Sequence, residues 1–493
     1  MVAVSWIPLQ TAFVWATLSF AIAGCFNPPA QTDATGDPAD TTSPTSEPDT
    51  TSPTTSAETS TSEPPTSEPP CTCTPPTYCL PDGGCGDCLE LAAQGGECPA
   101  ITPVCHSLLR ECVGCEIDEQ CDSRCDAQTH TCVECLLDDD CPLADFICDP
   151  DTHACVGCTE HADCPTTACD LEQSQCFPEA ATHLYVDDDD CGIDPMCPEA
   201  SRCCTLADAL TPALLNLKPH TIVHVSPGQY SAAVAISVDA RRIAILAETG
   251  STQTASATPP LSLTGTSALF VARLAVVGTD NALTAGVDCV DSPSLWFDDG
   301  EVVGMFASGL HAQNCDMHVR RTRISRNATS VLAGPGSRIS LENSTVSGDH
   351  SGLAVNTVGT GQVDLRYSTV LDYYPIDGQN HLISCDAMGA LEIRNSVVVD
   401  LAGMNLLVPC PYSLVTSAVT DGLFPPAADR VPINAGLVLS LFEAAMADDL
   451  DLAPGPNPLS TAARWQEGDP RTDIHGDPRP AVPDAVDAAG ADR

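Results

Sequence analysis

The chain has 493 residues, of which 67 are acidic and 19 are basic, so its formal net charge is −48. Such a surface repels phosphate backbones, and we therefore expect no nucleic-acid partner. The 29 cysteines and the Pro-rich stretches occupy separate parts of the chain, which argues against one uniform globular domain.

The N-terminal stretch, residues 1–24, is apolar and ends in small residues directly before Cys25. This pattern is typical of a signal peptide. Ile22-Ala23-Gly24-Cys25 resembles the lipobox of bacterial lipoproteins, which implies cleavage before Cys25, lipidation of Cys25 and attachment to a membrane through the lipid. Phe26 stands where that family carries Asp for inner-membrane retention, so the resemblance implies the outer membrane and the cell surface. An uncleaved transmembrane anchor is the alternative.

The segment 25–70 begins with the lipidated Cys25 and continues mainly with Thr, Ser, Pro, Glu, Asp and Ala, without Lys or Arg. It has almost nothing to bury. The composition predicts a disordered, extended stalk.

Residues 71–176 carry cysteines in recurring sets of four, with six residues between the last two of each set. Units of about 20 residues are too small for an apolar core, so each is expected to close two disulfides of its own. The Cys-x-x-Cys pairs between units also allow zinc, but behind a secretion signal disulfides are favoured and no metal is expected. The spacing resembles the Cys-rich repeats of secreted bacterial lipoproteins, which implies no defined activity. The complete sets are Cys88, Cys98, Cys105, Cys112; Cys115, Cys121, Cys125, Cys132; Cys135, Cys141, Cys148, Cys155; and Cys158, Cys164, Cys169, Cys176.

The segment 183–493 contains a decapeptide that recurs six times, at spacings of 22 to 28 residues. Its first, third and eighth positions are apolar in every copy. Positions one and three share a strand face, whereas the step to position eight requires a bend, at Asn343-Ser344, Tyr367-Ser368 and Asn395-Ser396. The copies begin at Leu269, Leu295, Met317, Ile339, Val363 and Leu391.

This repeat resembles the right-handed parallel β-helix of pectate-lyase-like proteins, in which each repeat forms one rung. The segments Thr205-Leu206-Ala207-Asp208, as part of an N-terminal cap, and Asp473-Ile474-His475-Gly476-Asp477, in an irregular C-terminal closing segment, resemble the ends of secreted bacterial β-helix proteins. His475 stands where that family commonly has Asp, which argues against a calcium loop. The expected fold class is therefore all-β: a right-handed parallel β-helix (solenoid) after a disulfide-rich repeat module and a disordered linker.

Four cysteines inside the coil test this fold. Cys289 and Cys315 are 26 residues apart, and Cys385 and Cys410 are 25 apart. Each separation is close to one turn, so we predict the disulfides Cys289–Cys315 and Cys385–Cys410.

The second and fourth positions of the decapeptide point outward. Polysaccharide lyases of this fold act on an outer strand face, and the resemblance makes five residues the catalytic candidates: Asp298, His318, Arg320, Glu342 and Arg366. Their charges alternate along the fourth position, which favours a stabilising ladder over catalysis. No cofactor is expected, with calcium kept as an alternative.

Carbohydrate sites commonly use aromatic platforms, and Trp296, Tyr373 and Tyr374 are the candidate binding residues. The sequence favours a non-enzymatic, surface-anchored protein that displays a structural surface or binds a glycan or protein ligand. The alternative is a polysaccharide lyase or glycoside hydrolase acting on an acidic polysaccharide.

Overall fold

The computed structural model describes residues 77–80, 85–94, 96–99, 102–106, 108–121, 123–141, 146–149, 152–255, 260–278, 284–372, 382–400, 410–425, 430–444, 449–480 and 482–492. Residues Cys71–Arg493 form one compact unit. The expected signal peptide, the lipidated Cys25, the stalk, and the candidate residues Tyr373 and Tyr374 lie outside the described residues.

The Cys-rich repeats are small antiparallel hairpins, each closed by two disulfides. In all four complete sets the first cysteine pairs with the third and the second with the fourth, as in Cys115–Cys125 and Cys121–Cys132. The hairpins are β3 (Val104–His106) with β4 (Glu111–Val113), β5 (Arg124–Asp126) with β6 (Thr131–Val133), β7 (Phe146–Cys148) with β8 (Cys155–Gly157), and β9 (Cys169–Asp170) with β10 (Gln175–Cys176). Before them lie β1 (Tyr78–Cys79), β2 (Cys85–Gly86) and helix α1 (Cys88–Ala93).

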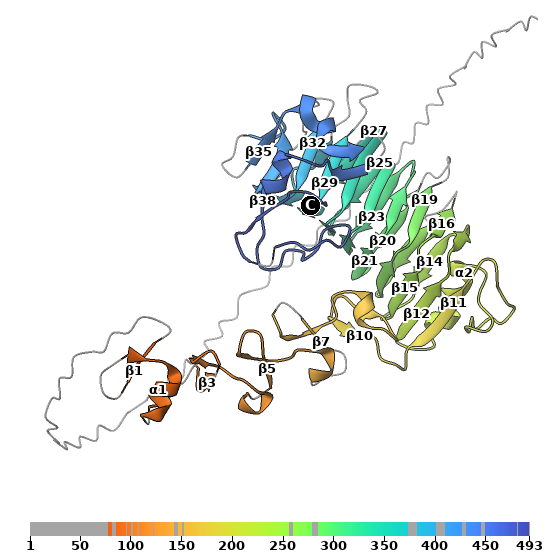
Figure 1. The fold of residues 1–493 in the computed structure, drawn as a ribbon. Coiled ribbons are helices and arrows are strands. Elements are labelled where there is room, and N and C mark those ends of the chain that lie inside the picture. Colours follow the sequence, from red (N-terminus) through yellow and green to blue (C-terminus); the bar gives the residue numbers. More distant parts are fainter. Residues whose placement is uncertain are drawn as a thin grey trace, which may run out of the picture. The chain divides into compact units, whose positions relative to one another are not determined.

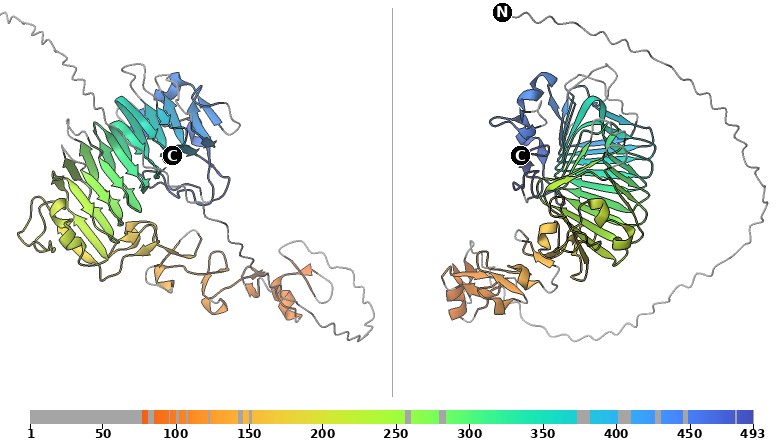
Figure 2. Two further views of the ribbon diagram at one scale, coloured as in Figure 1. Left: turned by 180° about the vertical axis from the view of Figure 1, so that it is seen from behind. Right: turned by 90° about the vertical axis from the view of Figure 1, so that its right-hand side faces the viewer.

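The rest of the unit is a parallel β-solenoid of about seven turns, which confirms the fold predicted from the repeat. Figure 1 shows its strands stacked side by side, and Figure 2 shows the same stack from behind. One flank is a ten-stranded parallel sheet. Its strands are β11 (Thr182–Val186), β12 (His220–Val225), β15 (Arg242–Ala247), β18 (Ala268–Ala272), β21 (Ser294–Asp298), β24 (Asp316–Arg320), β26 (Arg338–Glu342), β28 (Gln362–Arg366), β31 (Ala390–Arg394) and β33 (Tyr412–Val415).

The remaining flanks form one fifteen-stranded sheet, because the long strands β25 and β27 run through both flanks. Its strands are β13 (Gly228–Tyr230), β14 (Val234–Ser237), β16 (Ser251–Ala255), β17 (Leu261–Thr264), β19 (Ala275–Gly278), β20 (Val287–Val290), β22 (Glu301–Val303), β23 (Ser308–Gln313), β25 (Arg323–Ala333), β27 (Thr345–Thr357), β29 (Thr369–Asp372), β30 (Ile383–Cys385), β32 (Val397–Asp400), β34 (Ser417–Thr420) and β35 (Arg430–Ile433).

The core of the coil consists of the predicted apolar columns. Parallel pairing places Val319 opposite Leu341, and Leu341 opposite Leu365. Every first, third and eighth position of the six decapeptides is buried. The three columns therefore stack inward, one residue directly above the next.

The bend in each rung lies where the decapeptide predicts it, at positions five and six. Position five is left-handed in every copy, with φ between 46° and 60°, at Arg273, Asp299, Arg321, Asn343, Tyr367 and Asn395. Position six carries a ladder of hydroxyls: the Ser344 N–H donates to Ser368 Oγ, and the Ser368 N–H donates to Ser396 Oγ. Each hydroxyl also donates to the carbonyl two residues earlier, which fixes the corner of each rung.

Disulfides tie neighbouring rungs together. They join Cys289 to Cys315 and Cys385 to Cys410, the pairs expected from their spacing. Two more, Cys191–Cys204 and Cys197–Cys203, lie where the coil begins. There the short helices α2 (Leu206–Ala209) and α3 (Pro212–Leu215) cap the coil, and Thr205 Oγ1 accepts the Asp208 N–H at the start of α2.

The closing segment, residues 449–492, follows η4 (Ala435–Ser440) and β36 (Phe442–Ala444) and packs against the corner of the coil. It holds β37 (Asp449–Leu452), η6 (Pro458–Thr461), β38 (Ala463–Arg464) and β39 (Val486–Asp487). Asn343 Nδ2 donates to the Thr472 carbonyl, and Asn395 exchanges two hydrogen bonds with the Arg464 backbone. The bend asparagines thus hold this segment, while the serines beside them hold the turn. None of the helices among the described residues is long and apolar enough to cross a bilayer.

The hydroxyl ladder predicts a specific stability effect. Ser368→Ala removes a fully buried hydroxyl and leaves the Ser344 N–H without its acceptor, so we expect a loss of about 1–3 kcal/mol in unfolding free energy. Ser413→Ala, on an exposed position of β33, is the matched control and should change it by less than about 0.5 kcal/mol. Denaturant unfolding of both variants measures the difference; equal effects would contradict a role for the ladder.

Candidate functional site

The last Cys repeat, residues 158–176, packs on the outer face of the ten-stranded sheet, the surface that points away from the coil interior. The ring of Phe177, just after the repeat, meets Phe270 edge to face with centroids 5.9 Å apart. Phe270 holds the second decapeptide position, which we expected to face outward, and it is fully buried in an apolar cluster with Ile222 and Ala244. The outer face is therefore covered here by the chain itself.

Ion pairs and hydrogen bonds add to this apolar contact. The Arg242 guanidinium pairs with Asp170 and, at 2.6 Å, with Glu172 of the repeat region. Further along the coil, Arg320 Nη1 donates to the Thr159 carbonyl at 3.0 Å. Partly buried, hydrogen-bonded pairs of this kind hold two surfaces in one register.

The structure brings the five catalytic candidates onto neighbouring rungs of this face. Pairing sets Asp298 opposite Arg320, Arg320 opposite Glu342, and Glu342 opposite Arg366. Asp298 is only 2% exposed, and its Oδ2 accepts from Arg320 Nη2 at 2.6 Å and from Arg321 Nη2 at 3.0 Å. The first two members of the ladder thus form a direct ion pair.

His318 and Trp296 form a stack on the same face, with ring centroids 4.1 Å apart, and the Arg320 guanidinium lies 5.6 Å from the Trp296 ring centre. Trp296 is half-buried, and its Nε1 has no hydrogen-bond partner among the described residues. With one ring face already occupied by His318, Trp296 is not an open platform for a sugar ring.

Three cavities lie at this face and around the adjoining corner of the coil, and because they share lining residues they form one cleft. The corner cavity (about 340 Å³) and the repeat cavity (about 430 Å³) share Arg273 and Asp299. The segment cavity (about 390 Å³), beside residues 468–472 of the closing segment, shares Arg321 with the corner cavity and Glu160 with the repeat cavity. Their sizes fall in the usual range for ligand sites.

The corner cavity gathers positive charge in a chain that has little of it. Arg273, Arg321 and Arg323 line it together with Asp299 and Glu301. Arg321 binds Asp299 through two nitrogens, at 2.6 and 3.1 Å. The guanidinium groups of Arg273 and Arg323, by contrast, have no ion-pair or hydrogen-bond partner among the described residues.

Burial changes the titration of three acid–base groups that line the cleft. Together with the charges of the nearby Arg320 and Arg273, it lowers the pKa of His161 to about 4. It raises the pKa of Asp298 and of Glu342, while the arginines around them oppose the rise. Perturbed groups of this kind mark a cleft as a candidate functional site.

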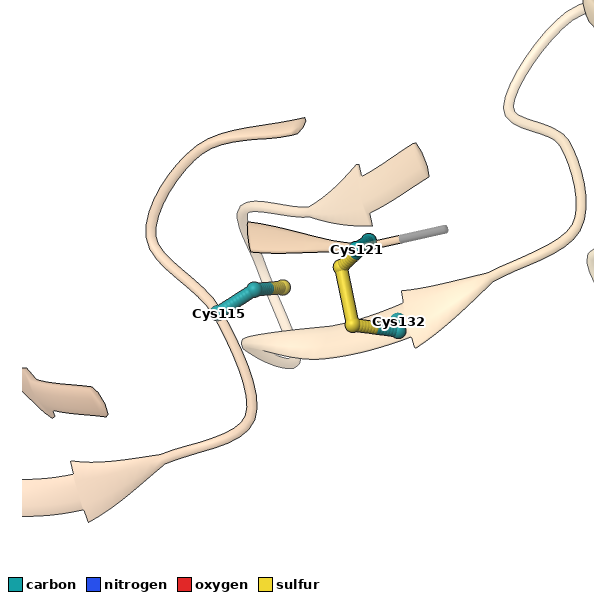
Figure 3. Close-up of side chains that lie close together, drawn as sticks. All are labelled: Cys115, Cys121 and Cys132. Atoms are coloured by element: carbon teal, nitrogen blue, oxygen red, sulfur yellow. A yellow bond between two sulfur atoms is a disulfide. The ribbon is translucent and has the colours of Figure 1, made fainter. Parts of the chain in front are cut away.

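Metal-ligand groupings of two kinds occur in the described part of the chain. In three of them the thiols belong to disulfides; Figure 3 shows the Cys115 side chain pointing toward the Cys121–Cys132 bridge, while Cys115 itself pairs with Cys125. In the fourth, His475 Nε2 lies 2.8 Å from Asp451 Oδ1 and 3.9 Å from Asp492 Oδ1. One imidazole with two carboxylates differs from the all-oxygen shell that calcium prefers.

Arg273, Arg323 and His161 are functional candidates that only the structure brings together. Arg273 occupies the left-handed fifth position of the decapeptide, so in the sequence it looks like an ordinary turn residue. Arg323 follows the corner at Arg321, two rungs further along the coil. His161 belongs to the last Cys repeat, far from the coil in sequence. The scarcity of basic residues, 19 in 493, is the signal that could have directed attention to two arginines beside turns two rungs apart.

No protein-family model matches the chain, and no curated protein matches it.

The docking of the last repeat can be tested at Arg242. We expect Arg242→Ala to loosen the repeat, because its guanidinium is the main charged contact to Asp170 and Glu172. The background is residues 71–493 carrying Trp465→Phe, in which Trp296 is the sole Trp. In this background, Arg242→Ala should make the Trp296 fluorescence several-fold more sensitive to quenching by acrylamide. Arg241→Ala, which removes only weak bonds to Asn216, should leave it unchanged; equal quenching in both variants would contradict the docking.

Acid should weaken the same docking through His161. Its pKa is about 4 when docked and 6.5 when exposed, so between these values only the exposed form binds a proton. The stability of the docked state therefore falls as pH drops from 6.5 to 4, by up to about 3 kcal/mol. Because burial also lowers the pKa of His224 and His318, the test compares Trp296 quenching against pH in the parent and in His161→Phe. A variant that keeps the parent's pH profile would contradict this role.

Proposed function

We propose that this chain is a non-enzymatic binding protein that holds an acidic polysaccharide in the cleft, anchored at the cell surface through Cys25. The observation that carries the proposal is the pair of arginines, Arg273 and Arg323, whose guanidiniums line the corner cavity without a partner among the described residues. A guanidinium that is not neutralised by the protein suits a carboxylate or sulfate of a ligand.

The spacing of the two arginines supports a polymeric ligand. Arg273 precedes β19 and Arg323 begins β25, and the rung of β22 lies between them. Two rung spacings place their backbones about 10 Å apart along the coil axis. A chain with acid groups at regular intervals contacts both guanidiniums, whereas a single small anion contacts one.

The lining of the cleft suits a charged, polar ligand. The described residues that line the three cavities include no Trp, Tyr or Phe, so the cleft offers neither the aromatic anchors of a typical protein interface nor an aromatic platform, and recognition of a sugar would rest on charge and hydrogen bonds. The corner cavity instead adds the exposed hydroxyl of Thr249 to its arginines, which supplies a hydrogen-bonding group for a polar, hydroxylated ligand.

The contacts and spacing of the candidate catalytic side chains support a non-enzymatic role. Asp298 is held by two arginines, and the sole lysine, Lys218, bonds backbone carbonyls far from the cleft. The acidic candidates Asp298 and Glu342 are separated by Arg320 on the rung between them, and a calcium site needs acids together.

A second candidate function is cleavage of an acidic polysaccharide by a lyase or glycoside hydrolase mechanism. One observation favours it: burial raises the pKa of Asp298, and Asp299 beside it lines both the corner and the repeat cavity. A carboxyl with a raised pKa is suited to act as a general acid.

The experiment measures binding of hexamers of galacturonate, mannuronate and guluronate to the full chain by calorimetry. We expect at least one to bind, and the double variant Arg273→Ala/Arg323→Ala to weaken it at least tenfold and to flatten its salt dependence. Arg241→Ala/Arg338→Ala changes the net charge equally outside the cleft and should bind like the parent. No binding by the parent, or equal loss in both double variants, would overturn the proposal, and release of unsaturated or reducing ends would establish the enzymatic alternative.

A further inference from the structure

The repeat cavity contains two buried polar atoms that lack partners. It is lined by the last Cys repeat on one side and by β12, β15 and β18 and the corner at Asp298 on the other. His161 Nε2 and Asp298 Oδ1 belong to residues that line it, and neither atom has a hydrogen-bond partner among the described residues. Unpartnered buried polar atoms are costly, so a ligand or water that satisfies both is favoured there.

His161 presents a donor. The Cys169 N–H donates to His161 Nδ1 at 3.1 Å, which leaves the ring proton of the neutral imidazole on Nε2. Burial and the neighbouring arginines keep the ring neutral near pH 7. The Nε2–H group is thus a fixed donor without an acceptor.

Asp298 presents an acceptor. Its Oδ2 is occupied by Arg320 and Arg321, and these two guanidinium contacts favour the carboxylate against the effect of burial, which raises the pKa, so that Oδ1 is left over as an acceptor. Asp298 is more than nine-tenths buried, so bulk water does not satisfy Oδ1.

We propose that the repeat cavity is a subsite for a neutral, hydroxyl-bearing sugar ring, next to the acid-binding corner cavity. A hydroxyl is the group that complements both atoms, because it accepts from Nε2–H and donates to Oδ1. A ligand carboxylate does not fit, since it cannot donate to Oδ1 and is repelled by Asp298.

The walls and the position of the cavity agree with this ligand. Leu246 and Ala272, on the outward side of the sheet, supply apolar surface for the C–H face of a ring. Arg273 and Asp299 line both cavities, so adjacent rings of one oligosaccharide can occupy the two subsites. The inference rests on the proposed function for the identity of the ligand as a glycan.

The test separates hydroxyl recognition from acid recognition. Uronate hexamers are prepared as free acids and as methyl esters, which keep the hydroxyls and lose the charges, and are titrated into the full chain. We expect an ester to bind the parent. It should bind His161→Phe at least tenfold more weakly, and it should bind Arg273→Ala/Arg323→Ala with an affinity within about threefold of the parent's. His161→Asn, which keeps an N–H donor, should recover part of the affinity.

Ala272→Leu, which narrows the cavity from the coil side without touching a polar group, should also lose ester binding, and Trp296 quenching reports whether the repeat stays docked in each variant. Failure of every ester to bind the parent, or an unchanged affinity in both His161→Phe and Ala272→Leu, would overturn the subsite. If the subsite fails in this way while the free-acid hexamers still bind through Arg273 and Arg323, the proposed function stands. Esters that bind while no free acid does would reject the acid-binding function alone.

Discussion

The parallel pairing of one rung on the next is the constraint on which this structure depends. A slip of one residue in any rung would turn its inward side chains outward, so every rung must bend at the same position. Left-handed backbone at position five provides that common corner in all six copies, and a hydroxyl at position six reinforces it in the last four, from Thr322 to Ser396. The same corner presents Arg273 and Arg321 side by side with Asp299, and it offers Asn343 and Asn395 to the closing segment.

The cleft arises because two covering segments meet one face of this regular coil. The last Cys repeat covers one part through Phe177, Arg242 and the Thr159 carbonyl, and the closing segment lies beside the other. Between them, charged side chains of the sheet are partly removed from water. This desolvation is the common cause of the lowered pKa of His161 and the raised pKa values of Asp298 and Glu342.

The coil could be predicted because its signals are local and repeated. Apolar residues at three positions of each decapeptide specify the inward columns, and the Asn-Ser and Tyr-Ser pairs specify the bend. The covering of the outer face could not be predicted, because Phe177 meets Phe270 across 93 residues of chain and no periodicity links them. For the same reason Asp298 looked like an exposed candidate, and the arginines of the cleft looked like ordinary turn and strand residues. The pairing inside each Cys repeat was also beyond spacing alone, since four cysteines allow three connectivities.

The interlaced bridges of the Cys repeats have a mechanical consequence. Tension applied to the N-terminal side of a unit reaches its fourth cysteine by two routes: through the first bridge and along the stretch from Cys125 to Cys132, or along the stretch from Cys115 to Cys121 and through the second bridge. The loop between the second and third cysteines is spared, and the row of units cannot be drawn out to its contour length. Hydrodynamic drag on a tethered molecule would accordingly reach the first rungs of the coil almost undamped, and it would do so at the docked repeat that forms one wall of the cleft.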